Sequence, residues 1–195
     1  MIIGLTGGIG AGKSTVASML VDRGAFVVSA DDVAREVVAP GSPGLARLVD
    51  AFGVEVLAAD GSLDRAELAR RVFDDEDQRL RLNAILHPLI AERTGELMAS
   101  GPAGSIRVHD VALLTELGLA GQYDHVIVVD CPDPIRLRRL VARGLTGAEA
   151  GARMAAQATR QQRLAIADTV IDNSRDLETL RDQVDVVWSQ LVAPA

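Results

Sequence analysis

Short apolar runs alternate with helically patterned stretches along this chain. Ile2 to Leu5 is apolar, glycines follow, and Thr15 to Val21 then carries apolar residues at helical spacing. Further strand-like runs lie at Ala25 to Ala30, Ile106 to Leu114, His125 to Cys131 and Thr169 to Ile171, and helical sequence at Pro134 to Ala142 and Asp176 to Val192. This alternation predicts an α/β fold with a parallel sheet.

The composition of the strands predicts helices on both faces of that sheet. VIVV (Val126 to Val129) is continuously apolar, as in parallel strands buried on both sides. From Asp31 to Ser100 the pattern is helical, with breaks at PGSPG (Pro40 to Gly44), ADGS (Ala59 to Ser62) and HP (His87, Pro88). We therefore expect several short helices there, with HP at the start of one of them.

A glycine-rich segment between the first strand and the first helix carries the strongest motif. Gly7 to Ser14 reads GGIGAGKS and satisfies G-x4-G-K-[S/T]. Its glycines let main-chain N–H groups turn toward phosphate oxygens at the positive end of the helix. We expect MgATP there, with contacts from Gly8, Gly10, Ala11, Gly12, Lys13, Ser14 and Thr15. Lys13 would bridge the terminal phosphates and Ser14 would bind Mg²⁺. A glycine turn that binds nothing is the alternative.

Other residues narrow the class of nucleotide-binding protein. Lys13 is the only lysine, so the N/T-K-x-D segment with which a GTPase reads guanine is absent. An ABC-type ATPase would need its signature sequence and more length, and a helicase would need a larger chain and a basic groove. The remaining class transfers a phosphoryl group to a small acceptor.

Length, charge and cysteine content limit the number of domains, the kinds of partner and the compartment that we expect. The 195 residues, 48% of them hydrophobic, suffice for one domain, and the formal charge of −7 disfavours nucleic acid or an anionic membrane as partner. No signal-peptide pattern or run of about 18 apolar residues occurs, so we expect a cytoplasmic protein. The lone Cys131 excludes an internal disulfide and a CxxC metal site.

Phosphoryl transfer to a hydroxyl needs a carboxylate near the acceptor. Asp31 and Asp32 end the second strand at the carboxyl edge of the sheet, where such folds bind ligands. Either could instead cap a helix beginning at Val33. Asp110 follows the third strand in a Walker-B-like position and is favoured for the magnesium shell, although a turn role is open and Asp130 ends the fourth strand in the same way.

A row of arginines follows the fourth strand. Arg136, Arg139 and Arg143 fall at i, i+3 and i+7, on one face of a helix. A solvated basic face is the alternative. The glycine-bearing stretch RGLTGAEAG comes next and is typical of a lid that closes over phosphates, which favours a binding role for the row.

Several motifs together resemble the dephospho-CoA kinase family over nearly the whole chain. They are LTGGIGAGKST (Leu5 to Thr15), SADDVAREVVAPGSPG (Ser29 to Gly44), DG-L-R-L (Asp60 to Leu68), LNAILHPLI (Leu82 to Ile90), DVALLTE (Asp110 to Glu116), RLRRLVAR (Arg136 to Arg143), AQATRQQR (Ala156 to Arg163) and ADTVIDN (Ala167 to Asn173).

The resemblance implies that ATP phosphorylates the ribose 3'-hydroxyl of dephospho-CoA to give coenzyme A and ADP. It implies Asp31 as general base and Arg139 and Arg143 as lid-side phosphate ligands. Arg35 and His87 would contact the acceptor, and Arg160 and Asn173 would lie beside the adenine. The chain departs from the family at Ser29, Ala112, Thr115 and Gly144, which affects the partner of the base, the acceptor pocket and lid closure.

The expected organisation is one P-loop kinase domain with a three-layer core. The core would comprise 1–31, 105–143 and 154–195, with an acceptor-binding helical region at 32–104 and a lid at 144–153. Only small molecules are expected as partners, and a monomer is favoured. A kinase for another nucleoside or nucleotide, and a nucleotide-dependent regulatory switch, are the alternative functions.

Overall fold

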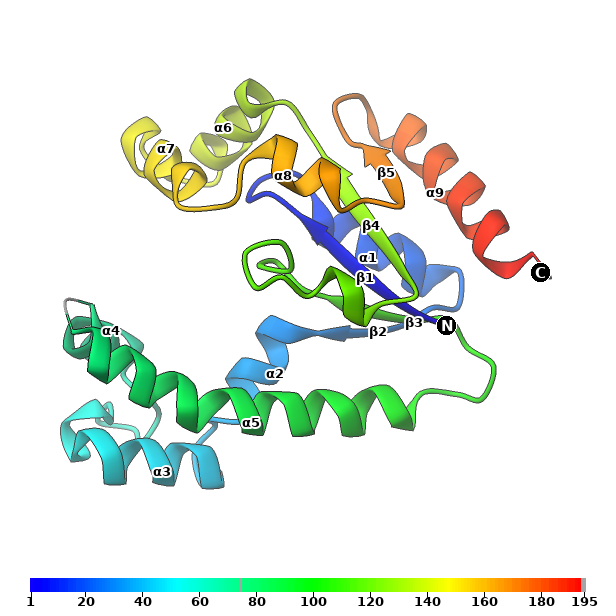
Figure 1. Cartoon of the computed structure of the whole chain (residues 1–195). Coiled ribbons are helices and arrows are strands. Elements are labelled where there is room, and N and C mark those ends of the chain that lie inside the picture. Colours follow the sequence, from blue (N-terminus) through cyan, green and yellow to red (C-terminus); the bar gives the residue numbers. More distant parts are fainter. Residues whose placement is uncertain (74, 194–195) are drawn as a thin grey trace. The chain divides into compact units, whose positions relative to one another are not determined.

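The computed structural model describes residues 1–73 and 75–193. The chain divides into two compact units. Met1–Ser29 and Gly101–Ala195 form the first, which contains the sheet and is called the sheet unit below. Ala30–Ser100 form the second, called the helical unit, which carries α2 to α5 in Figure 1.

The sheet unit is built on five parallel strands in the order β2-β3-β1-β4-β5. The strands are β1 (Ile2–Gly7), β2 (Phe26–Ser29), β3 (Arg107–Asp110), β4 (His125–Asp130) and β5 (Thr169–Asp172). β1 and β4 are buried at every position after the first, as expected for central strands covered on both faces. The predicted parallel α/β sheet is confirmed.

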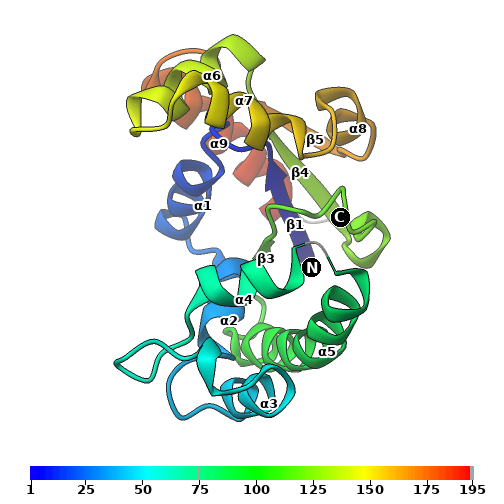
Figure 2. The same ribbon diagram turned by 90° about the vertical axis from the view of Figure 1, so that its left-hand side faces the viewer.

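Helices cover both sides of this sheet, as predicted for a three-layer fold. α1 (Lys13–Asp22) and α9 (Leu177–Val192) pack side by side on one face, and α8 (Arg160–Ala165) lies against β4 on the other (Figures 1 and 2). α6 (Asp133–Ala142) and α7 (Gly147–Ala155) pack against each other, and η2 (Ala120–Gln122) precedes β4.

The core beneath α1 and α9 follows from their apolar faces. Leu20 of α1 and Leu180 and Val184 of α9 are almost fully buried, in one cluster with Leu5 and Ile127 of the strands. These contacts fix α1 against the sheet, and with it the loop that precedes α1.

Strand order places the carboxyl ends of β1, β3 and β4 side by side. Leu5 of β1 pairs with Asp110, and Gly7 pairs with Val129 of β4. β1 lies between β3 and β4, where the chain changes direction across the sheet, and open parallel sheets bind ligands outside the strand ends at such a point. The glycine loop after β1 is therefore at the expected ligand-binding edge.

β3 is shorter than the apolar run that predicted it. The strand ends at Asp110, whereas the run continues to Leu114. Beyond Asp110 the chain turns, and Leu114 is buried against Gly4 without a place in the sheet. The apolar run therefore indicates burial here and does not indicate strand throughout. The strand stops at Asp110, where its pairing with Ser29 of β2 and with Leu5 of β1 ends.

The helical unit contains α2 (Ala30–Glu36), α3 (Pro43–Phe52), η1 (Val54–Val56), α4 (Arg65–Val72) and α5 (Glu76–Ser100). Ser42 and Asp64 cap α3 and α4 with their side-chain oxygens. The unit has its own apolar core, in which Leu48 and Val56 are fully buried. The predicted breaks at PGSPG and ADGS are confirmed: Pro40 to Ser42 separate α2 from α3, and Ala59 to Ser62 form a turn before α4.

The predicted break at His87 and Pro88 is wrong, because α5 runs continuously through both. Pro88 removes one main-chain hydrogen bond from the helix. Apolar residues before it, including Leu82 and Leu86, pack against the core of the unit, and Met98 after it is buried. Packing on both sides of the proline thus holds one helix together.

We predict that Pro88→Ala stabilises the helical unit. Pro88 is exposed, so alanine loses no packing, and it restores the N–H group that α5 lacks there. The free energy of unfolding in urea should rise by up to about 3 kcal/mol. Glu92→Ala, at another exposed position of α5, should change it by less than about 0.5 kcal/mol. An unchanged stability for Pro88→Ala would show that the helix does break at His87 and Pro88.

The predicted helix start at Val33 is also wrong. α2 begins at Ala30, directly after β2 ends at Ser29. Asp31 and Asp32 therefore lie in the first turn of α2, where acidic residues interact favourably with the helix dipole. Neither aspartate is the cap of a helix that begins at Val33.

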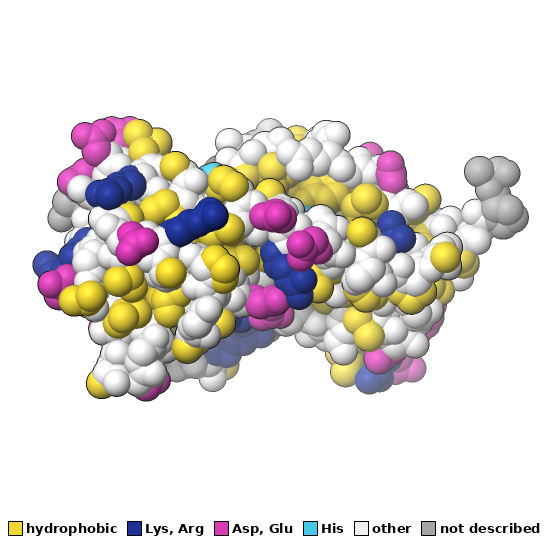
Figure 3. Space-filling view, turned by 90° about the horizontal axis from the view of Figure 1, so that it is seen from below, with side chains coloured by type: hydrophobic (Ala, Val, Ile, Leu, Met, Phe, Trp, Pro, Cys, Tyr) yellow, Lys and Arg dark blue, Asp and Glu magenta, His cyan; other side chains and the backbone are white. Residues whose placement is uncertain are grey.

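The surface carries both signs of charge. On the face in Figure 3, dark blue basic and magenta acidic side chains are interspersed among apolar ones. Within residues 1–73 and 75–193, no helix is both long enough and apolar enough to cross a membrane.

Candidate active site

The glycine loop after β1 has the shape that its sequence predicts. Gly10 and Gly12 have φ of 81° and 96°, in the left-handed region that favours glycine. The Ala11 N–H donates to the Gly8 carbonyl at 2.9 Å, and α1 begins at Lys13. The first N–H groups of a helix have no partner within it, so the loop and the start of α1 present donors suited to phosphate oxygens.

Lys13 and Asp110 come together at this edge. The Lys13 Nζ contacts Asp110 Oδ1, and both side chains are largely buried. Asp110 reaches this place because it is the last residue of β3, the strand beside β1. The Walker-B-like position expected for Asp110 therefore lies next to the loop lysine.

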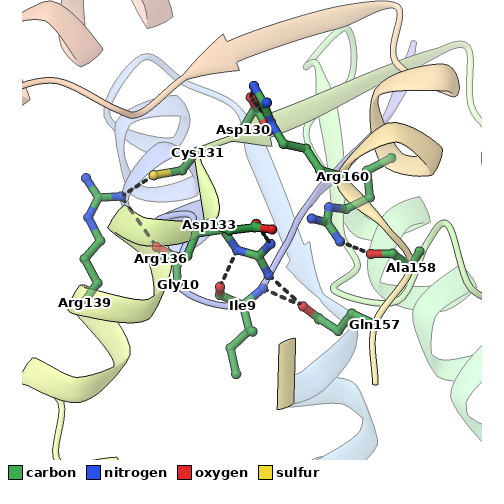
Figure 4. Close-up of polar contacts among 11 residues, drawn as sticks. Ile9, Gly10, Asp130, Cys131, Asp133, Arg136, Arg139, Gln157, Ala158 and Arg160 are labelled. Carbon is green, nitrogen blue, oxygen red and sulfur yellow. Dashed lines mark hydrogen bonds and ion pairs between the residues drawn. The ribbon is translucent and has the colours of Figure 1, made fainter. Parts of the chain in front are cut away.

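Asp130, the other candidate for the magnesium shell, is held by Arg160. The Arg160 Nε and Nη2 donate to the Asp130 carboxylate at 2.9 Å and 2.6 Å (Figure 4). Their ion pair raises the pKa of the Arg160 guanidinium above its ordinary value. Arg160, expected beside the adenine, is thus fixed to the end of β4 by a two-pronged pair.

Asn173 and Arg139 support the loop from the side opposite β3. The Asn173 Nδ2 donates to the Ala11 carbonyl at 2.7 Å, and the side chain fills the space that a Cβ on Gly12 would need. The Arg139 Nη2 donates to the Asn173 carbonyl at 2.9 Å, and its Nη1 to the Ala11 carbonyl at 3.3 Å. Both residues therefore lie against the nucleotide loop.

The three arginines of the row that begins on α6 differ in how far they are buried. Arg136 is 3% exposed, Arg139 is half-buried, and Arg143 is exposed at the C-terminal cap of the helix. The solvated basic face that was the alternative is therefore wrong for Arg136. Arg136 contacts the loop at Ile9, as Figure 4 shows.

A second buried arginine lies beside Arg136. Arg163 of α8 is 4% exposed, and burial, with the nearby Arg136 charge, lowers the pKa of its guanidinium. A Cβ on Gly8 would lie 2.5 Å from Arg136 Nη2 and 2.9 Å from Arg163 Nη2. Both guanidinium groups thus pack against Gly8, where a Cβ would displace them.

A pocket of about 580 Å³ opens between α6, α7 and α8. Its walls include Asp133, Arg136, Met154, Gln157, Arg160 and Arg163. The sheet unit therefore has an open hollow beside the loop, lined by three arginines and by apolar side chains.

The expected acceptor residues belong to the helical unit. Asp31 lies in the first turn of α2, and Arg35 lies in its last turn, where its Nη1 donates to Asp32 at 2.8 Å. His87 is exposed in the middle of α5. Asp31 and Arg35 thus share one short helix, and His87 is on another helix of the same unit.

Comparison with known proteins identifies the family. The dephospho-CoA kinase family model matches residues 1–179. A dephospho-CoA kinase of Streptomyces avermitilis is 56% identical over 191 residues, covering 97% of this chain and 93% of the relative. One of Thermobifida fusca is 53% identical over 190 residues, covering 97% and 95%.

The chain belongs to the dephospho-CoA kinase family. It is therefore a kinase, and family membership supports the ATP-dependent final step of coenzyme A synthesis as its reaction.

Solved structures agree with the kinase fold. A crystal structure from Thermus thermophilus superimposes with a TM-score of 0.84 at 32% identity, covering 99% of this chain and 98% of the other. A dephospho-CoA kinase of Campylobacter jejuni gives 0.73 at 24% identity, covering 97% and 96%. A shikimate kinase of Bacteroides thetaiotaomicron, at 0.55 and 14%, shares the fold.

The oxygen donors at the loop of this kinase suit Mg²⁺. Mg²⁺ is bound through one or two protein oxygens, with water and substrate phosphates completing its octahedral shell. Ser14 offers a hydroxyl in the first turn of α1, and Asp110 offers a carboxylate beside Lys13. Among the described residues, no three acidic, histidine or cysteine side chains gather as a metal cage. The residues present fit a magnesium ion that arrives with its nucleotide.

Sequence reasoning missed two residues around the loop of this kinase. Gln157, just after α7, accepts a hydrogen bond from the Ile9 N–H at 2.7 Å, and Arg163 packs against Gly8. Both lie in AQATRQQR, which pointed to the family without indicating a role for either. No periodicity or spacing signal links this segment to residues 8 and 9, because the contacts span about 150 positions of sequence.

Proposed function

We propose that this chain transfers the γ-phosphoryl group of ATP to the ribose 3'-hydroxyl of dephospho-CoA, giving coenzyme A and ADP. The observation that supports this most is the phosphate loop with Lys13 beside Asp110, in a chain that matches the dephospho-CoA kinase family over residues 1–179. Transfer of this kind relies on positioning and on stabilisation of charge rather than on a covalent enzyme intermediate.

On the nucleotide side, Gly8, the residues from Gly10 to Thr15 and the Lys13 ammonium would bind the phosphates, while the Ile9 N–H donates to Gln157. Arg139 and Arg143 would donate to the transferring group. A guanidinium carries five N–H donors, so Arg139 can hold loop carbonyl groups and still donate to a phosphate oxygen. Arg160 and Asn173 are proposed beside the adenine.

Ser14 and Asp110 would hold Mg²⁺, which when bound neutralises charge on the phosphate oxygens. When the nucleotide and its metal enter, the Lys13 ammonium would exchange part of its contact with Asp110 for contact with phosphate. Lys13 and Asp110 are thus proposed to hold each other in position before the nucleotide arrives.

On the acceptor side, Asp31 would accept or orient the proton of the attacking hydroxyl. Arg35 and His87 would contact dephospho-CoA, and both lie in the proposed acceptor-binding region, residues 32–104. Residues 144–153, which comprise a glycine turn and most of α7, would form the lid. We further propose that the protein acts in the cytoplasm as a monomer.

The test is coupled measurement of ADP release from MgATP. Release should depend on dephospho-CoA, and the product should be coenzyme A by mass spectrometry. A panel of nucleosides and nucleotides should give a much lower kcat/KM than dephospho-CoA. A higher kcat/KM for another acceptor would assign that substrate instead, and hydrolysis that ignores every acceptor would favour a regulatory switch.

A further inference from the structure

Ile9 of the phosphate loop is held on both of its peptide groups by side chains from outside the loop. Its N–H donates to the Gln157 Oε1 at 2.7 Å, and its carbonyl accepts from the Arg136 Nε at 2.9 Å. Arg136 Nη2 also donates to the same Gln157 oxygen at 3.3 Å, so the three residues close a ring of hydrogen bonds (Figure 4). Two successive peptide planes of the loop are thereby fixed.

The chemistry of the ring determines the orientation of the Gln157 amide. Both neighbours of its Oε1 are N–H donors, so an amide oxygen fits there and an amide NH₂ group does not. The Arg136 side chain is also held in one position. Its Nη1 pairs with Asp133 at 2.8 Å, and burial to 3% exposure leaves it little freedom to move.

The ring is adjacent to the part of the loop that turns toward the phosphates. The main chain of Arg136 and the side chain of Leu140 lie within 3.0 to 3.2 Å of the place where a Cβ on Gly10 would be, so α6 contacts the residue after Ile9 as well. The direction of the following loop N–H groups depends on the two peptide planes that the ring fixes. An error of about 1 Å in such groups can cost about 10²-fold in rate.

Arg136 and Gln157 also bracket the proposed lid in sequence. Arg136 lies on α6 before residues 144–153, and Gln157 lies directly after α7. One residue before this segment and one after it therefore contact the same residue of the phosphate loop.

We propose that Arg136 and Gln157 are positioning residues for phosphoryl transfer, which act by clamping the Ile9 peptide groups so that the loop is organised before ATP binds. This proposal rests on the proposed function. It requires neither residue to touch the substrate: the Gln157 amide and the Arg136 guanidinium act on the reaction through Ile9.

The first test is hydrogen exchange at the Ile9 amide, followed by NMR in the protein without substrates. Gln157→Ala removes the acceptor, and exchange at Ile9 should become about tenfold faster or more, because the amide then opens to water. Gln157→Glu keeps the acceptor oxygen and should retain the protection. Gln161→Ala, at an exposed position four residues further on, should leave Ile9 unchanged. Equal exchange in Gln157→Ala and wild type would overturn the clamp.

The second test separates positioning from folding by kinetics. Gln157→Ala should lower kcat about 10- to 100-fold and change the KM for ATP by less than about threefold, since the loss falls on the transition state. The melting temperature should stay near that of Gln161→Ala. A change confined to the KM, or a kcat equal to that of Gln161→Ala, would contradict the proposal.

A double-mutant cycle tests whether the two residues act together. Arg136→Gln combined with Gln157→Ala should lose little more kcat than the more damaging single variant, because either change opens the same ring. Arg138→Gln, an exposed arginine of the same helix, is the control and should combine additively with Gln157→Ala. Additive losses for Arg136 and Gln157 would show separate roles and overturn the clamp. The exchange experiment needs no acceptor, so its result is independent of whether dephospho-CoA is the substrate.

Discussion

Lys13→Met should abolish turnover. The variant keeps an unbranched side chain of similar length and removes the ammonium group that contacts Asp110 and is proposed to bridge the terminal phosphates. Removing one preorganised donor to transition-state charge costs about 10²- to 10³-fold in kcat, and the loss of a full positive charge should reach or exceed the upper value. Initial rates of ADP release with saturating dephospho-CoA measure the effect.

The same variant leaves Asp110 without its partner, so the fold has to be checked separately. Circular dichroism and the melting temperature should show a folded protein, because the other loop contacts, such as Asn173 to Ala11, do not involve Lys13. Lys13→Arg retains the charge in a larger and planar group and should recover only part of the rate. Turnover near the wild-type rate in folded Lys13→Met would refute the assignment of the loop.

Asp31→Asn should lower kcat by about 10²- to 10⁴-fold, the usual contribution of a general base. The change is isosteric and replaces the carboxylate by a neutral amide, which cannot accept the hydroxyl proton. The KM for ATP should change little, because the nucleotide is proposed to bind through other residues. Steady-state kinetics measure both parameters when dephospho-CoA and ATP are varied in turn, each with the other substrate saturating.

Asp32→Asn provides a matched control in the same helical turn. Asp32 is exposed and accepts a hydrogen bond from Arg35 at 2.8 Å, a surface pair of the kind that contributes little to stability. Its substitution should leave kcat within about threefold of wild type. A large loss in Asp32→Asn with a small one in Asp31→Asn would exchange the two roles, and small losses in both would remove α2 from catalysis.

Much of the fold is present in local sequence pattern. Continuous apolar runs gave strands buried on both faces, and the glycines at 10 and 12 stand where the main chain has positive φ. These features depend on neighbours in sequence, through side-chain periodicity and through the conformations that glycine allows. The phosphate loop was therefore predictable together with its flanking strand and helix.

Local pattern failed where tertiary contacts outweigh propensity. Pro88 is typical of a helix boundary, yet α5 is continuous, with Leu82 and Leu86 packed on the core before the proline and Met98 buried after it. The apolar run that ends at Leu114 reads as strand, yet the ladder partners end at Asp110. In both cases the deciding contacts come from residues distant in sequence.

By itself the sequence determined the phosphate loop, the parallel α/β class and the family, because each is recognised from motifs or apolar runs of neighbouring residues. Tertiary structure alone decided which arginines of α6 are buried, that Asp130 is paired with Arg160 while Asp110 contacts Lys13, and that Gln157 binds Ile9. These pairings join strand ends, helices and loops that only the order of the sheet brings together. No periodicity along the chain encodes them, since a hydrogen bond between residues 9 and 157 exists only once the layers have packed.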